Sequence, residues 1–430
     1  MNTVQKKNLL LFNFGRFISS IGSSIQYLAI PLYILDKTGL GIYIGIFTLI
    51  SKLPLLIMTP FAGVLGDRWN RKRILILNDL GRGIIIFILA ILSCFNIMNI
   101  AILFCCQVLI SVMDSLYNAS TLSILPQLVN ETDYNRSNAT SGGIISLSYI
   151  VGPVLFGIIY TTEGIQMIFF INACSFIISA ICETFISYYN KINKTNKINI
   201  KIFINKNLEV LTLIKHNIGL KQLLIYSTIV NFFAIPILIV ILPFLLKKVI
   251  GFSSLQYSYL MTSLSVGVLL GNIIIGFSSN KLNTGKLMKL GIIIEILLLI
   301  LLSFIVFPPI IFLFKEKIWS YFIVIGTTLL IVGLFNASIS TSITTNFQKI
   351  VPDKIRSRFF SVLNLISLCI VPIGSLIYGF LIDKIQTYLL LFFIGIFLLC
   401  ISLVFFYFAL PEIYSPREWA NDITNCVVDE

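Results

Sequence analysis

Charged side chains are scarce in this chain. Only 11% of its 430 residues are Asp, Glu, Lys or Arg, whereas soluble domains average about 25%. Hydrophobic residues make up 57%, so the composition predicts a protein embedded in a lipid bilayer. The formal net charge of +13 is better explained by basic cytosolic loops than by a nucleic-acid partner, because Lys and Arg on that side orient membrane helices.

Residues that build enzyme and metal centres are also rare. The single histidine, His216, lies in a basic segment and is expected to be solvated, so we predict no metal site. No Walker-type phosphate loop is present, which argues against direct use of ATP. Most of the eight cysteines lie in apolar runs, where they act as small hydrophobic residues and not as a disulfide framework. We therefore expect no cofactor and no enzymatic activity.

Long apolar runs, by contrast, are abundant. A helix needs about 20 apolar residues to cross a bilayer, and internal glycine and proline are tolerated in such helices. The sequence predicts an all-α membrane protein. Its twelve expected spans lie near 9–35, 42–66, 74–95, 99–124, 138–161, 165–188, 222–246, 254–279, 287–308, 318–345, 358–382 and 387–410.

A Lys- and Asn-rich segment divides these spans into six plus six. We predict an N-terminal half at 1–188, a cytosolic basic linker at 189–221, a C-terminal half at 222–410 and a cytosolic tail at 411–430. Most Lys and Arg residues fall in loops on the same side as the linker, so both termini are expected in the cytosol. We expect a multi-pass monomer in the cytoplasmic membrane.

The two halves also share short sequence elements in the same order. Asn118-Ala119-Ser120 is matched by Asn336-Ala337-Ser338, Arg136 by Arg358, and Gly63 by Gly276, at separations of about 213 to 222 residues. These matches predict two related six-helix repeats.

The most distinctive stretch joins the second and third spans. It reads Gly63-Val64-Leu65-Gly66-Asp67-Arg68-Trp69-Asn70-Arg71-Lys72-Arg73. It resembles the loop signature Gly-x-Leu-x-Asp-Arg-x-x-Arg-Lys of the major facilitator superfamily of secondary transporters. Two positions depart from the usual pattern, because Asn70 stands where the family often has Gly, and Gly66 where it often has Ala.

This resemblance implies the major facilitator fold, in which twelve transmembrane helices form two six-helix repeats that work by alternating access. It further implies a gating role for the loop residues. Asp67, with Arg68, Arg71 or Arg358 as its partner, would hold the cytosolic ends of the two halves together in one access state. Gly63 and Lys72 complete the signature.

Charged residues within the apolar runs are costly and need a reason. Asp79 and Arg82 are three positions apart, so they share a helix face and are expected to neutralise each other. Glu183 lies near the end of its span and is expected to be solvated. Asp114 lies mid-span, and its expected partner is Lys52 or Arg16.

A carboxyl group in a low-dielectric site can exchange protons near neutral pH. Asp114 is therefore the leading proton-coupling candidate, and Lys52, Arg16 and Glu295 are the others. The alternative for Asp114 is a permanent structural ion pair.

The fifth span is rich in glycine. Gly142-Gly143 is followed by Gly152-Pro153-Val154-Leu155-Phe156-Gly157. This resembles the antiporter signature of drug-exporting members of the family, although Phe156 replaces one glycine. Proline removes a helix hydrogen bond and glycine permits close helix contact. We expect a pivot at Gly143, Gly152, Pro153 and Gly157; an ordinary packing seam is the alternative.

Two further stretches, Leu125-Pro126-Gln127-Leu128-Val129 and Gln348-Lys349-Ile350-Val351-Pro352, resemble the branch that contains macrolide and siderophore exporters. The resemblance implies proton-coupled export of a small amphipathic compound or antibiotic. Metabolite uptake or exchange by the same fold, and a polytopic membrane enzyme, remain as alternatives.

Overall fold

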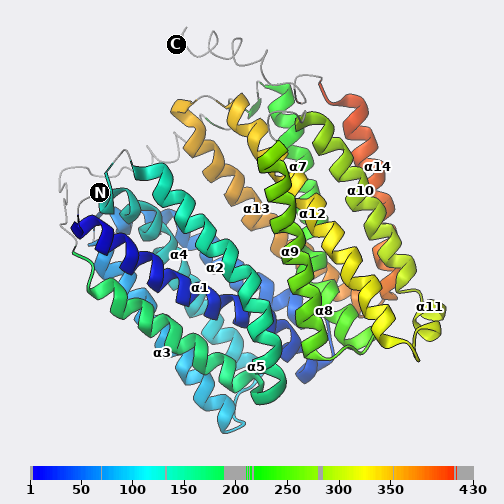
Figure 1. The fold of residues 1–430 in the computed structure, drawn as a ribbon, viewed down its shortest axis with the longest axis horizontal. Helices are drawn as coiled ribbons and strands as arrows, with labels where there is room; N and C mark the ends of the chain where they lie inside the picture. Colours follow the sequence, from blue (N-terminus) through cyan, green and yellow to red (C-terminus); the bar gives the residue numbers. More distant parts are fainter. Residues whose placement is uncertain are drawn as a thin grey trace. The chain divides into compact units, whose positions relative to one another are not determined.

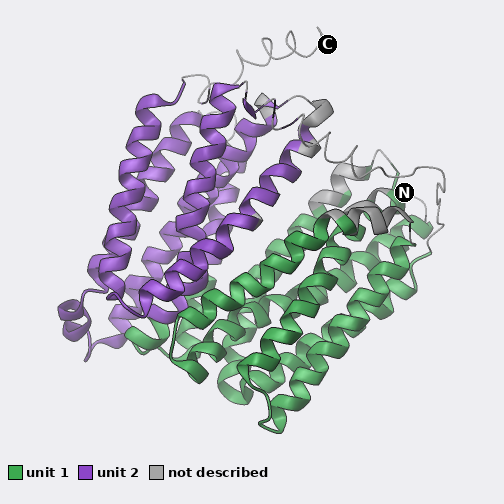
Figure 2. Cartoon of the chain, turned by 180° about the vertical axis from the view of Figure 1, so that it is seen from behind, with its two compact units in different colours: residues 1–197, 246–262 green, residues 198–245, 263–430 purple. Residues whose placement is uncertain are grey.

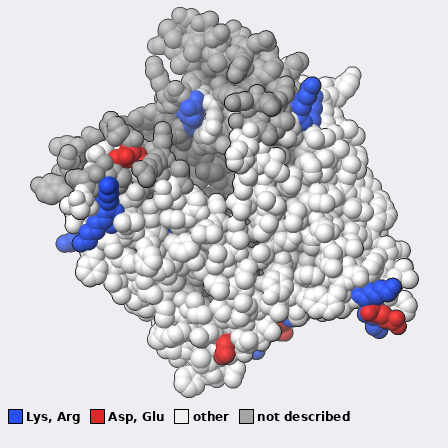
Figure 3. Space-filling view, viewed as in Figure 1, with Lys and Arg blue, Asp and Glu red and all other residues white. Residues whose placement is uncertain are grey.

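A computed structural model describes residues 3–68, 70–130, 133–187, 210, 212, 214–215, 217–278, 284–351, 353–410 and 413. All regular elements within these ranges are helices (Figure 1). This follows from the apolar runs, because a backbone in lipid must satisfy its hydrogen bonds within its own segment. Eleven of the described helical segments are long and apolar enough to cross a membrane. On the face shown in Figure 3, the described charged residues lie near the margins of the view, and the surface between them is uncharged.

The chain forms two compact units, of which unit 1 comprises residues 1–197 and 246–262 (Figure 2). Within this unit α1 and α3 pack on α5, and α2 packs on α4. Its complete helices are α1 (Thr3–Thr38), α2 (Ile42–Arg68), α3 (Arg71–Cys94), α4 (Ile100–Leu128) and α5 (Tyr134–Thr184).

Helix α3 begins at a side-chain cap. The Asn70 side chain accepts a hydrogen bond from the backbone N–H of Arg73, which satisfies one of the unpaired donors of the first turn. Asn70 is one of the two departures from the family's loop signature. Its capping bond gives that departure a local structural role.

Helix α5 is long enough for two membrane crossings. Its 51 residues would extend about 77 Å as one straight helix, more than twice the roughly 30 Å hydrocarbon core. At Gly164 the backbone leaves the helical region, with φ 74° and ψ −165°, a conformation that favours glycine. Such a break would allow α5 to cross the bilayer twice. In this way eleven spanning helices can supply the twelve crossings expected from the sequence.

Unit 2 comprises residues 198–245 and 263–430. Its first span starts as α7 and continues through two π-helical turns near Pro236 and Pro243. Proline has no backbone N–H to donate, so the regular α-helical hydrogen bonding is interrupted there. Helix α10 packs on α12 and α14, and α7 packs on α13. The elements are α7 (Ile218–Pro236), η2 (Ile237–Ile241), α8 (Leu242–Phe244), η3 (Leu245–Val249), α9 (Ser254–Ser278), α10 (Thr284–Ile305), α11 (Pro308–Leu313), α12 (Ile318–Ile350), α13 (Asp353–Ile382) and α14 (Thr387–Phe408); η3 and the start of α9 belong to unit 1.

Several predictions concern residues that are not described. Most of the expected linker at 189–221, with His216, lies outside the described ranges, as does the expected tail at 411–430 apart from Ile413. The domain boundaries inferred from the sequence therefore stay predictions.

Candidate functional site

The charge cluster of unit 1 consists of Asp79, Arg82 and Asp114. The Arg82 Nη1 donates to Asp114 Oδ1 at 2.7 Å, and Arg82 Nη2 donates to Asp79 Oδ1. The rings of Tyr117 and Phe176 lie 4.2 and 4.4 Å from the guanidinium carbon. One cation is thus held by two carboxylates and two aromatic rings, an arrangement suited to guanidinium because it offers five N–H donors in a plane.

Helices α3, α4 and α5 build this cluster, and α5 contributes Phe176. The i, i+3 spacing on α3 places Asp79 and Arg82 on one face, and the same spacing on α4 presents Asp114 beside Tyr117. The expected Asp79–Arg82 pair is present. The expected partner of Asp114 was wrong: its described ion pair is with Arg82, not with Lys52 or Arg16. Pairing with Asp79 does not exhaust Arg82, because one guanidinium can bond two carboxylates.

The two acids of the cluster differ in access to solvent. The Arg82 side chain is 6% exposed and Asp79 is fully buried, whereas the Asp114 side chain is 36% exposed. Of the two acids, Asp114 is therefore the one whose carboxylate is accessible from outside the cluster.

Glu183, near the end of α5, is buried at 2% exposure, so the expectation that it is solvated was wrong. Its place in sequence near a helix end did not reveal that neighbouring helices cover it. Its Oε2 has no hydrogen-bond partner among the described residues. It adds a further acid to the buried polar region near the charge cluster.

The loop signature is only partly described. Lys72 Nζ donates to the backbone carbonyl of Thr184 at 2.7 Å, which places a cation at the C-terminal end of α5, where helix carbonyls are unpaired. Arg71 is the first residue of α3, and Gly63, Asp67 and Arg68 lie in the last turns of α2. The side chains of Asp67, Arg68 and Arg358 are outside the described set, so their predicted gating contact stays a prediction.

The glycines of the expected pivot have different surroundings. A Cβ added at Gly152 would lie 2.5 Å from Ser24 Cβ of α1, and one added at Gly157 would lie 2.5 Å from Ser258 Cβ of α9. The Ser258 hydroxyl also donates to the carbonyl of Pro153. Gly143 has no atom within 4 Å of such a Cβ. Close helix contact thus involves Gly152 and Gly157 but not Gly143.

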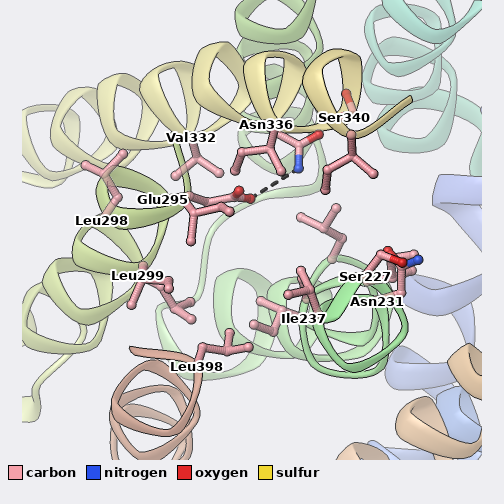
Figure 4. Close-up of a pocket in the computed structure, with 18 of the residues that line it drawn as sticks. Ser227, Asn231, Ile237, Glu295, Leu298, Leu299, Val332, Asn336, Ser340 and Leu398 are labelled. Carbon is pink, nitrogen blue, oxygen red and sulfur yellow. Dashed lines mark hydrogen bonds between the residues drawn. The ribbon is translucent and has the colours of Figure 1, made fainter. Parts of the chain in front are cut away.

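Unit 2 contains a cavity of about 350 Å³ among its own helices (Figure 4). Its described lining is mainly aliphatic and includes one carboxylate, that of Glu295. Asn336 Nδ2 of α12 donates to Glu295 Oε1 of α10 at 3.1 Å. Ser227 and Asn231 of α7 lie on another wall (Figure 4). Sequence reasoning singled out Glu295 and Asn336 separately; it missed the cavity because several helices must pack before it exists.

Repeated helices that are long and apolar enough to cross a bilayer define a multi-pass membrane protein. The cavity in unit 2 is large enough for a small ligand. The model of the Major Facilitator Superfamily matches residues 12–367 and 224–423. The chain belongs to this family, and the fold and family expected from the sequence are confirmed.

Relatives extend over almost the whole chain. Macrolide efflux protein A of Streptococcus pyogenes is 24% identical over 395 residues, covering 91% of this chain and 93% of that protein. Staphyloferrin A transporter of Staphylococcus aureus is 21% identical, covering 91% and 94%. Among solved structures, a bacterial homolog to the human lysosomal transporter Spinster has a TM-score of 0.73 at 13% identity, covering 97% of this chain and 98% of that one. The protein is a transporter, and the polytopic-enzyme alternative is set aside because its relatives and fold are those of transporters.

Proposed function

We propose that this transporter is a proton-coupled exporter of small amphipathic compounds, antibiotics among them, in the cytoplasmic membrane. A relative named for macrolide efflux spans nearly the full chain, which favours export over the alternative of metabolite uptake. A second full-length relative is named for transport of staphyloferrin A, which is consistent with a small-molecule substrate. The basic loops favour cytosolic termini.

The observation that carries the coupling is the 2.7 Å contact between Arg82 and Asp114. Asp114 is the more exposed of the two acids, with 36% of its side chain accessible, so its carboxylate is the one better placed to take up and release a proton. While Asp114 is ionised, the cluster holds one guanidinium against two carboxylates. When Asp114 binds a proton, Arg82 remains neutralised by Asp79 and its hold on α4 weakens. A proton can thus change the attraction between α3 and α4, which is what coupling to a conformational change requires.

Other residues keep supporting roles in this proposal. Arg16, Lys52 and Glu295 are the remaining coupling candidates. Close contacts at Gly152 and Gly157 fit a packed pivot on α5, which a rocking motion would use.

Cells that express the protein test the export proposal. Susceptibility and accumulation should be measured across a panel of toxic compounds, including macrolides. We expect lower accumulation of at least one amphipathic compound, and everted membrane vesicles should take it up when their lumen is acidified. Uptake that persists after a protonophore collapses the gradient would contradict proton coupling. Higher accumulation in expressing cells would favour uptake instead.

A further inference from the structure

Burial repeats between the two units, so their residues can be compared by position. Gly276 follows Gly63 by 213 positions. With the same separation applied to α3 and α10, the buried residues Leu75 and Leu89 correspond to the buried residues Met288 and Leu302. The buried faces of α3 and α10 are therefore formed by equivalent positions of the two repeats.

The same holds for α4 and α12. Asn336 follows Asn118 by 218 positions. At that separation the buried Ser111 corresponds to the buried Leu329, and the buried Ser120 to the buried Ser338. The two helix pairs thus present equivalent positions to the interiors of their own units.

At the positions of the charge cluster, the two units carry different side chains. Arg82 corresponds to Glu295, and its two acidic partners, Asp79 and Asp114, correspond to Ile292 and Val332. Unit 1 places a cation between two carboxylates. Unit 2 has a carboxylate at the position of Arg82. The two positions that correspond to the acids of unit 1 are aliphatic, so neither of them supplies a cation to pair with Glu295.

The space around Glu295 is open. Ile292, Glu295 and Val332 all line the cavity of about 350 Å³, and none of the described residues that line it is Lys or Arg. The described structure gives the carboxylate one hydrogen bond, from Asn336 to Oε1. A carboxylate in an aliphatic cavity is costly without a counter-charge. A ligand that carries a positive charge would supply the counter-charge that Glu295 lacks among the described residues lining the cavity.

We infer that the unit 2 cavity binds a small organic cation, with a guanidinium or ammonium head against Glu295 and an apolar body along the aliphatic wall. A planar guanidinium matches a carboxylate by two parallel hydrogen bonds. The volume lies at the lower end of ordinary ligand pockets, about 300–1,000 Å³. This binding does not depend on the direction of transport.

The test compares two probes of nearly equal shape on the purified full-length protein in nanodiscs. The cation n-hexylguanidinium and the neutral n-hexylurea are titrated by calorimetry without any gradient. We expect the cation to bind at least about 30-fold more tightly, because removing one member of a buried charge pair costs upwards of 2 kcal/mol. Equal affinities in the unaltered protein would overturn the inference without any variant.

Two variants locate the site. Glu295→Gln should remove the preference for the cation, whereas Glu316→Gln, which makes the same change at an exposed position, should preserve it. A Glu295→Gln protein that folds and still prefers the cation would place the binding elsewhere.

Val332 provides a second, independent pair of variants. Val332→Lys supplies an internal cation beside Glu295 and should abolish the preference. Val332→Met adds similar length without charge and should retain a preference for the cation. Loss of the preference in both variants alike would overturn the role of charge. A transporter that fails to export in cells would leave these binding results standing, so the two proposals fail separately.

Discussion

Arg82 Nη1 of α3 lies 2.7 Å from Asp114 Oδ1 of α4, and the same guanidinium bonds Asp79. A single side chain thus links two helices and neutralises acids on both. Removing one member of a buried ion pair strands the others in low dielectric, which is far more costly than the net contribution of the pair. Loss of Arg82 should therefore cost more stability than the intact cluster contributes.

Arg82→Gln should destabilise the protein by about 3–5 kcal/mol, because it leaves two carboxylates without their cation. Thermal unfolding of the purified variant measures the effect. Arg73→Gln removes an exposed arginine from the start of the same helix and should change stability by less than about 0.5 kcal/mol. Similar melting temperatures for the two variants would show that the charge cluster does not stabilise unit 1.

Asp114→Asn should abolish proton-driven accumulation in everted vesicles while downhill exchange of the same compound persists. The amide keeps the shape of the side chain but cannot take up and release a proton. Glu163→Gln, an exposed acid on α5, serves as the control and should transport normally. If Asp114→Asn still builds a gradient that responds to pH, the proton is carried elsewhere, and Glu295 is the next residue to test.

Asp67→Asn should depress transport without loss of protein in the membrane. The loop resemblance assigns Asp67 to a charged contact that favours one access state, and the amide weakens that contact. Transport rates normalised to the amount of membrane protein provide the measurement. Wild-type rates in a well-expressed variant would remove Asp67 from the gating assignment.

Gly152→Ala should destabilise the protein by about 1–3 kcal/mol, because the new methyl group overlaps Ser24 and forces α1 and α5 apart. Gly143→Ala meets open space and should be neutral or stabilising by up to about 1 kcal/mol through helix propensity. Melting temperatures of the two purified variants test this contrast directly. Equal destabilisation would mean that the contact at Gly152 yields easily.

Cysteine probes test the orientation. In a background without native cysteines, Asn193→Cys and Lys315→Cys should react with a membrane-impermeant reagent from opposite sides. The distribution of basic residues predicts that position 193 lies in the cytosol and position 315 outside. Labelling of position 193 in intact cells would reject the assigned orientation.

Local features explain how far the sequence could predict the fold. The prediction of a helical protein with about a dozen spans follows from length and apolarity alone. Asp79 and Arg82 are neighbours on any helix because they are three residues apart. The break at Gly164 is also local, since its positive φ suits glycine. Burial of Glu183 was missed because its covering residues come from other helices.

The sequence by itself therefore determined a helical membrane transporter with internally repeated halves, because the bilayer restricts a long apolar run to very few structures. Only the tertiary structure decided that Arg82 joins Asp114 and that Glu295 lines a cavity with Asn336. In spans that are apolar on nearly every side, the pattern of residues scarcely indicates which face meets which neighbour. Helix rotation and packing fix those meetings, and they join residues 32 and 41 positions apart in the chain.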